Sequence, residues 1–471
     1  MNNNNIKIGV LPIGILLTLI IGAFLAYNLL EGDKSYFLAG DTSHGHYQIE
    51  LECESCHTGP FADQDKMQLA CESCHAKELD KVSDTHPKKK FLDPRNANLL
   101  EKLDARYCVS CHKEHKPEIT RNYGVTLASD FCFHCHQQIA EDRESHAGFE
   151  FNSCATSGCH NYHDNTMLYE KFLTKHLDEP DVKTEPTLPQ RSGIKSWLKK
   201  HKLKKLPEAD APKFNDALLK FQDSDPAIWQ SIHSKWQSSV HAKVNANCVD
   251  CHQSEENKES DSFIKADKNT DVHSYALKNV ENCASCHKKQ ADSFLESKHG
   301  MRLAHNLSPM STQLSRLKTD KSQDKTLSCN SCHDPHSVDV KSAAVDACLG
   351  CHQDEHSKAY QQSKHFALWQ QEQAGDVEIG SGVSCASCHL PRIKKGKRVE
   401  VAHNQNQTLR PNTKMLRTVC MNCHGLEFSL ASLADQNLIK NNFQGKPDKG
   451  HQSIELVKQR LQQKSSQSLK E

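Results

Sequence analysis

Eleven cysteine pairs, each followed directly by a histidine, dominate the chemistry that this sequence offers. Ten of them have the spacing C-x-x-C-H, and the eleventh, CATSGCH, places Cys154, Cys159 and His160 at a wider spacing. The ten regular pairs are Cys53 and Cys56, Cys71 and Cys74, Cys108 and Cys111, Cys132 and Cys135, Cys248 and Cys251, Cys283 and Cys286, Cys329 and Cys332, Cys348 and Cys351, Cys385 and Cys388, and Cys420 and Cys423. Together the eleven pairs use all 22 cysteines of the chain.

C-x-x-C-H is typical of the covalent attachment of c-type haem. The two thiols add to the porphyrin vinyl groups, and the histidine ligates the iron from the proximal side. The histidines in this position are His57, His75, His112, His136, His160, His252, His287, His333, His352, His389 and His424. Zinc sites and disulfide scaffolds also use paired cysteines, but neither accounts for a histidine after every second cysteine. The sequence therefore predicts eleven covalently attached haem c groups, with CATSGCH counted among the sites.

The second axial ligand of each iron is predicted to be histidine. The chain has 30 histidines, so 19 remain after the eleven proximal ones, against only 7 methionines. The predicted second ligands are His46, His86, His115, His146, His163, His241, His273, His299, His336, His365 and His403. Of the other eight histidines, His233, His305 and His356 are the first alternatives. Bis-histidine haems transfer electrons and have no open position for a substrate, so no catalytic residue is predicted.

The composition suits a core that is not made of side chains alone. Only 36% of the residues are hydrophobic, which is little for a chain of 471 residues. Lys+Arg and Asp+Glu both number 59, so the net charge is zero and a nucleic-acid partner is not expected. We predict a mainly α fold with long loops and little sheet, wrapped around a chain of haems, with one N-terminal transmembrane helix.

Residues 1–30 are predicted to be a transmembrane anchor. The largely apolar run 8–30 is long enough to cross a bilayer as a helix. A cleaved signal peptide is the alternative, but Ile21 and Phe24 would occupy the small-residue position before the two candidate cleavage sites. Because bacterial c-type haems are attached outside the cytoplasmic membrane, we expect a single-pass inner-membrane protein with its haem domains in the periplasm.

The motifs fall into two groups, which predict the domain organisation. We expect a five-haem domain at 41–177, a linker at 178–230, a six-haem domain at 231–445 and a C-terminal tail at 446–471 that packs over the last haem. The linker contains a basic segment, 195–206. This segment could lie on anionic lipid or dock an acidic partner, but its apolar positions form no clean helical face, so a solvated helix is preferred.

Each half of the chain resembles a different group of multihaem proteins. The first half, with GHYQIELECESCHTGPF, CVSCHKEH and GCHNYHDN, resembles the class III-like multihaem cytochromes c. The second half, with SSVHA, CNSCHDPH, CASCHLPR and CMNCHG, resembles the hydroxylamine oxidoreductase and multihaem nitrite reductase superfamily. Two features of those enzymes are not matched here: every motif ends in His rather than Lys, and neither Tyr275 nor Tyr360 is evidently placed for a tyrosine–haem crosslink.

Electron transfer is therefore the leading functional hypothesis. The protein would relay electrons in anaerobic or alternative respiration, from a membrane quinol-oxidising or other redox donor to a periplasmic or outer-membrane acceptor. One alternative is a multihaem oxidoreductase acting on hydroxylamine, nitrite or tetrathionate at a haem of the second half. Another is a subunit of a larger membrane complex. The ligation state of the irons separates the relay from the enzyme.

Overall fold

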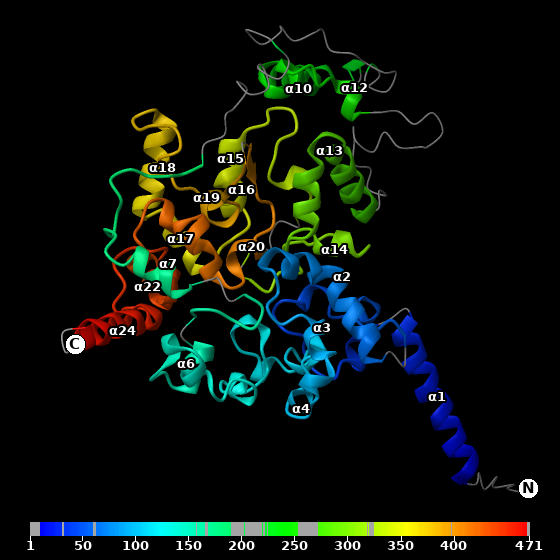
Figure 1. The fold of residues 1–471 in the computed structure, drawn as a ribbon. Helices are drawn as coiled ribbons and strands as arrows, with labels where there is room; N and C mark the ends of the chain where they lie inside the picture. The colour runs from blue at the N-terminus through cyan, green and yellow to red at the C-terminus, as the bar shows by residue number, and fades with distance from the viewer. Residues whose placement is uncertain are drawn as a thin grey trace, which may run out of the picture. The chain divides into compact units, whose positions relative to one another are not determined.

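The computed structural model describes residues 10–30, 33–59, 63–156, 158–164, 168–189, 225–252, 272–317, 325–396 and 398–468, with the isolated positions 202, 219, 222, 223 and 319. Two units divide the chain, Met1–Gln137 and Gln138–Glu471, and each is described by itself. The predicted fold class is confirmed, since the described residues are mainly helical with very little sheet (Figure 1).

Short helical turns joined by loops build most of the first unit. Its elements are α1 (Val10–Leu30), η1 (Lys34–Phe37), η2 (Tyr47–Ile49), η3 (Cys53–Ser55), α2 (Gln64–Val82), α3 (Lys88–Phe91), η4 (Pro94–Asn96), α4 (Ala97–Leu100), η5 (Cys108–Ser110), η6 (Pro117–Ile119), η7 (Asn122–Gly124) and η8 (Phe131–His134). The long helix α2 begins where the Asp63 side chain accepts a hydrogen bond from the Lys66 backbone N–H, and it ends at Ser83 in the left-handed region. These boundaries place the whole motif Cys71–His75 inside one helix.

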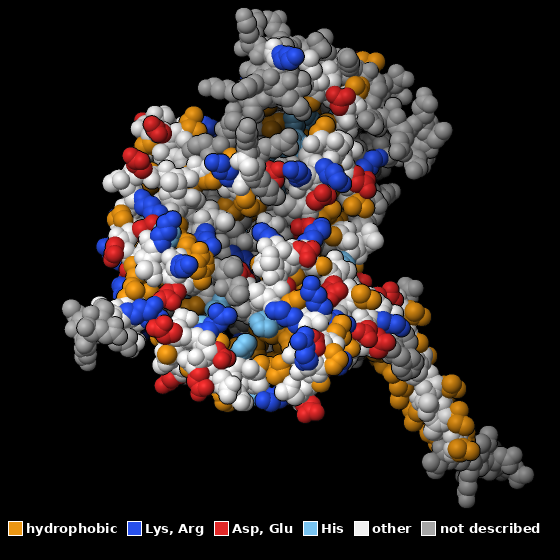
Figure 2. All heavy atoms as spheres, in the orientation of Figure 1, with side chains coloured by type: hydrophobic (Ala, Val, Ile, Leu, Met, Phe, Trp, Pro, Cys, Tyr) orange, Lys and Arg blue, Asp and Glu red, His pale blue; other side chains and the backbone are white. Residues whose placement is uncertain are grey.

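Helix α1 is largely apolar. Its segment Leu11–Leu30 has a mean hydropathy of 2.3 and almost no buried surface, and hydrophobic side chains cover its length (Figure 2). A 21-residue helix of this composition is long enough to cross a membrane. Both a membrane anchor and a signal sequence have these properties.

The second unit has the same character with longer helices. Its elements are α5 (Ile139–Asp142), η9 (Glu144–His146), α6 (Phe151–Thr156), α7 (Glu170–Lys175), α10 (Pro226–Ser238), α11 (Val240–Lys243), α12 (Cys248–Cys251), α13 (Val272–Leu295), α14 (Met301–Ala304), η10 (Cys329–Ser331), α15 (Val340–Ala344), α16 (Asp346–Leu349), α17 (Glu355–Tyr360), α18 (Lys364–Ala374), α19 (Cys385–His389), β1 (Arg392–Lys395), β2 (Arg398–Val401), α20 (Asn406–Leu409), η11 (Asn412–Lys414), α21 (Met415–Thr418), η12 (Cys420–Asn422), α22 (Leu426–Ala434), α23 (Gln436–Lys440) and α24 (Gln452–Ser468). The two strands form an antiparallel hairpin with Arg392 opposite Val401.

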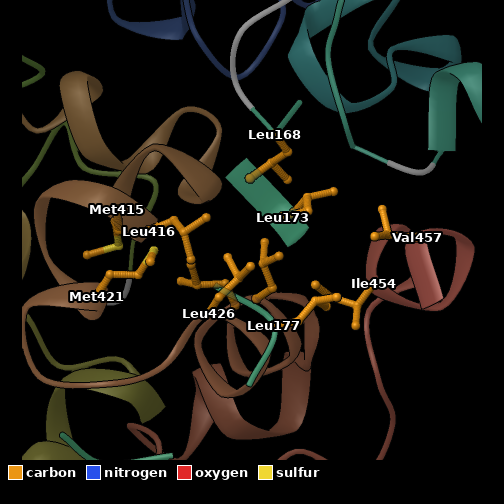
Figure 3. Packing of buried hydrophobic residues seen from close by; sticks show 11 residues of the cluster. Leu168, Leu173, Leu177, Met415, Leu416, Met421, Leu426, Ile454 and Val457 are labelled. Carbon is orange, nitrogen blue, oxygen red and sulfur yellow. The ribbon is translucent and has the colours of Figure 1, made fainter. Parts of the chain in front are cut away.

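The larger hydrophobic core of the second unit joins segments that are far apart in sequence (Figure 3). It gathers residues in and beside α7, α21, η12, α22 and α24: Leu168, Leu173, Leu177, Met415, Leu416, Met421, Leu426, Leu430, Leu433, Ile454 and Val457. The partly buried Cys388 and Cys420 pack against it. The C-terminal helix α24, within the predicted tail, is thus part of the core beside the last two motifs.

The first part of the predicted linker also lies on the last motif. Val182 forms an isolated β-bridge with His424, and the Lys183 backbone N–H donates to the Cys423 carbonyl at 2.8 Å. The approach is so close that a Cβ on Gly425 would lie 2.6 Å from the Pro180 carbonyl oxygen, so glycine is required at 425. The basic segment 195–206 lies outside the described residues except for position 202, and the expected domain boundaries remain predictions.

Candidate haem-binding sites

A tight backbone turn shapes the regular motifs. In seven of them, those beginning at Cys53, Cys108, Cys132, Cys248, Cys329, Cys348 and Cys420, the histidine N–H donates to the carbonyl of the first cysteine. Residues i, i+3 and i+4 of a helical turn share one face, so both thiols and the imidazole project to the same side. All 22 cysteines are free thiols. A porphyrin that bonds two thiols and one imidazole requires this arrangement.

The variant motif CATSGCH reaches its second cysteine by leaving the helix. Helix α6 contains Cys154 and ends at Thr156, and Gly158 has φ +70°. Glycine adopts this left-handed conformation without the steric cost that other residues bear. The chain can therefore turn back to present Cys159 and His160 after the helix has ended.

Nine motif histidines face a second histidine from elsewhere in the chain, with ring centres 5.9–6.3 Å apart. The pairs, motif histidine first, are His75 and His46, His136 and His86, His160 and His146, His252 and His336, His287 and His241, His333 and His403, His352 and His299, His389 and His356, and His424 and His365.

This spacing fits a metal held between two imidazoles. An imidazole nitrogen bonds a transition metal at about 2 Å and lies about 1 Å from its ring centre, so two rings on opposite sides of one ion have centres about 6 Å apart. Among the described residues, His, Cys, Asp and Glu form no group of three or more suited to a metal ion. The donor sets are therefore two-imidazole sets, each beside a pair of thiols, as a bis-histidine haem c requires.

Eight of the nine second histidines are among those proposed from the sequence. The exception is His356, whose ring lies 6.1 Å from that of His389. The side chain of the predicted ligand His273 lies outside the described residues, so its role stays a prediction. The sequence names His356 only among the first alternatives. Its position four residues after His352 resembles the CHKEH and CHDPH sequences that suggest ligands, and this signal favours it. The predicted ligands His115 and His163 appear in none of these nine pairs, and their role remains a prediction.

Hydrogen bonds at Nδ1 orient several of these rings. His424 Nδ1 lies 2.8 Å from the Asp181 carbonyl oxygen, and His403 Nδ1 lies 3.1 Å from that of Val401. His356 Nδ1 contacts the Ile439 carbonyl oxygen. A ring whose Nδ1–H donates to a carbonyl keeps Nε2 as the free lone pair. These contacts fix the tautomer that can bind a metal through Nε2.

Burial keeps several paired rings in the neutral form. Desolvation lowers the pKa of His299, His365 and His389 to about 4, and a neighbouring histidine of the same site adds to the effect. At neutral pH these imidazoles are therefore uncharged. Metal binding requires that form, so no energy is needed to deprotonate them.

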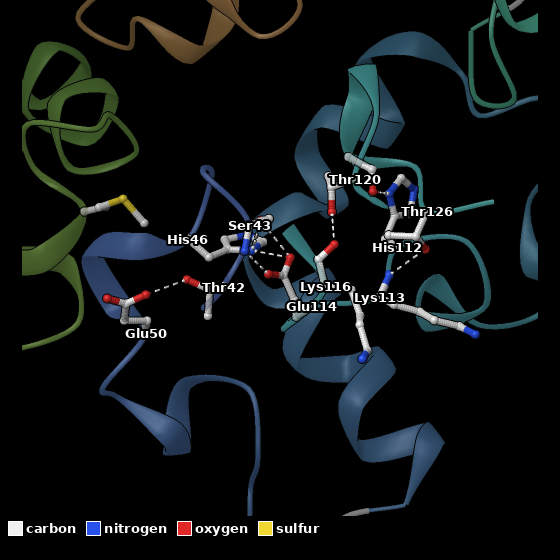
Figure 4. Close-up of polar contacts among 12 residues, drawn as sticks. Thr42, Ser43, His46, Glu50, His112, Lys113, Glu114, Lys116, Thr120 and Thr126 are labelled. Carbon is white, nitrogen blue, oxygen red and sulfur yellow. Dashed lines mark hydrogen bonds and ion pairs between the residues drawn. The ribbon is translucent and has the colours of Figure 1, made fainter. Parts of the chain in front are cut away.

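A carboxylate supports the ring of His46 (Figure 4). Glu114 Oε1 lies 2.7 Å from His46 Nδ1, and the Ser43 backbone N–H and hydroxyl donate to the same carboxylate at 2.7 and 2.9 Å. Burial would raise the pKa of Glu114, but the hydrogen bonds from His46 and Ser43 outweigh it and lower the pKa to about 2. The carboxylate is thus ionised over the physiological pH range.

The motifs of the second group are neighbours in space in the order of the sequence. Asn282, just before the second of these motifs, donates through its side chain to the Cys251 carbonyl of the first at 3.1 Å. Thiols of consecutive motifs influence one another's pKa through these pairs: Cys251 and Cys283, Cys283 and Cys329, Cys332 and Cys348, Cys348 and Cys385, and Cys388 and Cys420. In the first unit, Cys56 and Cys74, and then Cys71 and Cys108, continue the same pattern. The attachment sites therefore form rows rather than isolated centres.

Two further predicted attachment thiols, Cys286 and Cys351, are the second cysteines of their motifs. Cys286 is exposed, and its Sγ accepts a hydrogen bond from the Ser285 hydroxyl at 3.8 Å. Cys351 is half-buried, and its backbone N–H donates to the carbonyl of the first cysteine of its motif at 3.1 Å. Beyond the effect of burial, Cys286 helps to raise the pKa of Cys251, and Cys351 helps to raise that of Cys332. Both thiols thus lie within the row, and their covalent attachment to haem remains a prediction, as it does for the other cysteines.

Comparison with known proteins gives one match. Residues 45–137 match the family model of cytochrome c3, a span of 93 residues that ends where the first unit ends. No curated protein matches the chain, and no solved structure does. The resemblance of the second half to the hydroxylamine oxidoreductase superfamily therefore stays a prediction. Residues 45–137 form a cytochrome c3-like domain, which supports c-type haem as the cofactor and a multihaem electron-transfer role for the protein.

Proposed function

We propose that the chain binds eleven haem c groups and serves as a membrane-tethered electron relay. The observation that carries this proposal is the set of nine imidazole pairs spaced about 6 Å apart beside cysteine pairs. Bound haem would supply reversible one-electron oxidation and reduction. The protein supplies attachment, two axial imidazoles at each site and a fixed spacing between sites.

Filled axial positions favour a relay over an enzyme. An iron that activates a small nitrogen or sulfur compound needs one free coordination position. In each of the nine pairs, the second imidazole would supply the ligand that fills this position. The buried Tyr360, one of two tyrosines in the second half, donates its hydroxyl to the Val383 carbonyl at 2.8 Å. This contact gives Tyr360 a structural role rather than one at a reacting centre.

The row of attachment sites supports transfer along the chain. The thiols that anchor one site lie beside those of the next, from Cys251 in the first site of the second group to Cys420 in the last. These cysteines would hold the haems of consecutive motifs as neighbours in the row. Donor and acceptor can then be different proteins that dock at different ends of the row.

The membrane attachment and the partners complete the proposal. The apolar helix α1 would anchor the protein in the inner membrane, with the haem domains in the periplasm, where c-type haems are attached in bacteria. The donor would be a membrane quinol-oxidising or other redox protein. The acceptor would be a periplasmic or outer-membrane redox protein in anaerobic or alternative respiration.

Film voltammetry of the purified holoprotein tests the relay against the enzyme. A relay gives reversible one-electron waves that do not change when hydroxylamine, nitrite or tetrathionate is added. A catalytic current with any of these compounds would contradict the proposal and favour a multihaem oxidoreductase.

A further inference from the structure

The site formed by His46 and His75 has a carboxylate beside each imidazole. His46 Nδ1 lies 2.7 Å from Glu114 Oε1, and His75 Nδ1 lies 3.3 Å from Glu78 Oε2. Other paired rings have more distant or neutral acceptors at Nδ1. The carboxylates of Asp334 and Asp354 lie 3.8 and 3.9 Å from Nδ1 of His336 and His352, which is beyond hydrogen-bond distance. His403 and His424 contact backbone carbonyls, and His146 contacts the Ser145 hydroxyl at 2.9 Å.

The contact between Glu114 and His46 is stabilised by the surrounding structure. The two residues are 68 positions apart, and each side chain is about one-third exposed. Two hydrogen bonds from Ser43 hold both carboxylate oxygens in place. The contact between Glu78 and His75 lies within α2, three residues apart, and is more exposed. Glu114 is therefore the stronger of the two carboxylate partners.

A carboxylate changes the ligand that it contacts. A charge-assisted hydrogen bond at Nδ1 is stronger than one to a neutral carbonyl. It moves electron density onto the ring and raises its basicity as a ligand. A more basic ligand stabilises the ferric over the ferrous state, which lowers the reduction potential.

On the basis of the proposed function, we propose that Glu114 is a positioning residue. Through His46 it lowers the reduction potential of the haem attached at Cys71 and Cys74, and Glu78 adds to this effect through His75. This haem then has a lower potential than haems whose imidazoles donate to backbone carbonyls. Its thiols lie beside Cys56 on one side and Cys108 on the other. Electron transfer onto this haem is therefore thermodynamically unfavourable within the row of the first unit.

The test is a potentiometric titration of full-length, detergent-solubilised holoprotein, followed by electron paramagnetic resonance (EPR) of the individual low-spin haems. Glu114→Gln removes the charge but keeps an oxygen acceptor. We expect one haem to become easier to reduce by at least tenfold in its equilibrium constant, which is about 59 mV for one electron. Glu78→Gln should shift the same haem by less. His46→Met identifies that haem, because it replaces one of its two imidazoles.

The matched control is Glu118→Gln, which removes the same charge from an exposed position four residues away. It should leave all the potentials unchanged. If a signal responds to His46→Met but shifts no more with Glu114→Gln than with Glu118→Gln, the inference is overturned while the proposed function stands. If His46→Met changes no low-spin signal, the ligand assignment within the proposed function is wrong, and the inference is wrong with it.

Discussion

At the scale of single residues, the position of His356 decides which imidazole lies opposite the motif residue His389. Desolvation lowers the pKa of the motif residue His389 to about 4, and the ring opposite it belongs to His356. His356 lies in the first turn of α17, where the Asp354 side chain caps the helix by accepting from the Ser357 backbone N–H at 3.0 Å. The cap that starts helix α17 therefore helps to position the His356 imidazole.

Replacing His356 should open one iron. His356→Ala removes the imidazole opposite His389, so one haem should become high-spin and bind carbon monoxide when reduced. The matched control is His273→Ala, at the residue expected from the sequence to be a ligand, which should leave every haem low-spin. Ultraviolet–visible and EPR spectra of the two variants check this. High-spin haem in His273→Ala but not in His356→Ala would reverse the assignment.

At the scale of elements, helix α24 and the start of the predicted linker both pack in the region of the last motif. Helices α7 and α24 pack together through Leu173, Ile454 and Val457, and residues 179–187 lie along the last motif. The tail is predicted to pack over the last haem. Its helix α24 contributes Ile454 and Val457 to the core, and Cys420 of the last motif packs against the same core. The sequence predicts a linker at 178–230 because this stretch lies between the two groups of motifs and contains Pro-rich and charged segments. The contacts of residues 179–187 are made largely by their backbone, which side-chain patterns do not encode.

Gly425→Ala tests this contact. The new Cβ would lie within 3 Å of the carbonyl oxygens of Glu179 and Pro180, so the backbone must shift. Overpacking of this kind costs about 1–3 kcal/mol, and we expect a lower midpoint of thermal unfolding. Gly45→Ala is the control, because its Cβ would meet only Ser43 Oγ at an ordinary 3.6 Å. An unchanged midpoint in Gly425→Ala would show that residues 179–187 do not hold this position.

Deleting α1 tests its role as an anchor. A protein without residues 1–30, expressed behind a cleavable signal peptide, should mature into soluble holoprotein with the same haem spectrum. The reason is that α1 buries almost none of its surface in the rest of the chain. Fractionation and haem staining provide the measurement. Holoprotein that stays in the membrane fraction, or fails to mature, would rule out a simple tether.

At the scale of the whole molecule, the two parts of the prediction rest on different signals. The mainly helical class and the attachment sites follow from local signals, since C-x-x-C-H lies within five consecutive residues. The second ligands come from farther away, from 14 residues between His146 and His160 to 84 between His252 and His336. Eight of the ring pairs still contain the expected histidine, because each of those histidines stands in a distinctive short context. The spatial order of the sites and the carboxylate at His46 depend on tertiary packing and could not be predicted.

We propose that the chain uses its surplus histidines to close the axial positions of its irons. The most direct measurement combines haem quantitation by pyridine haemochrome with EPR spin quantitation of the oxidised full-length protein, followed by carbon monoxide addition to the reduced protein. We expect eleven haems per chain, all low-spin, and no carbon monoxide complex. A smaller haem count, or a high-spin haem that binds carbon monoxide, would contradict it.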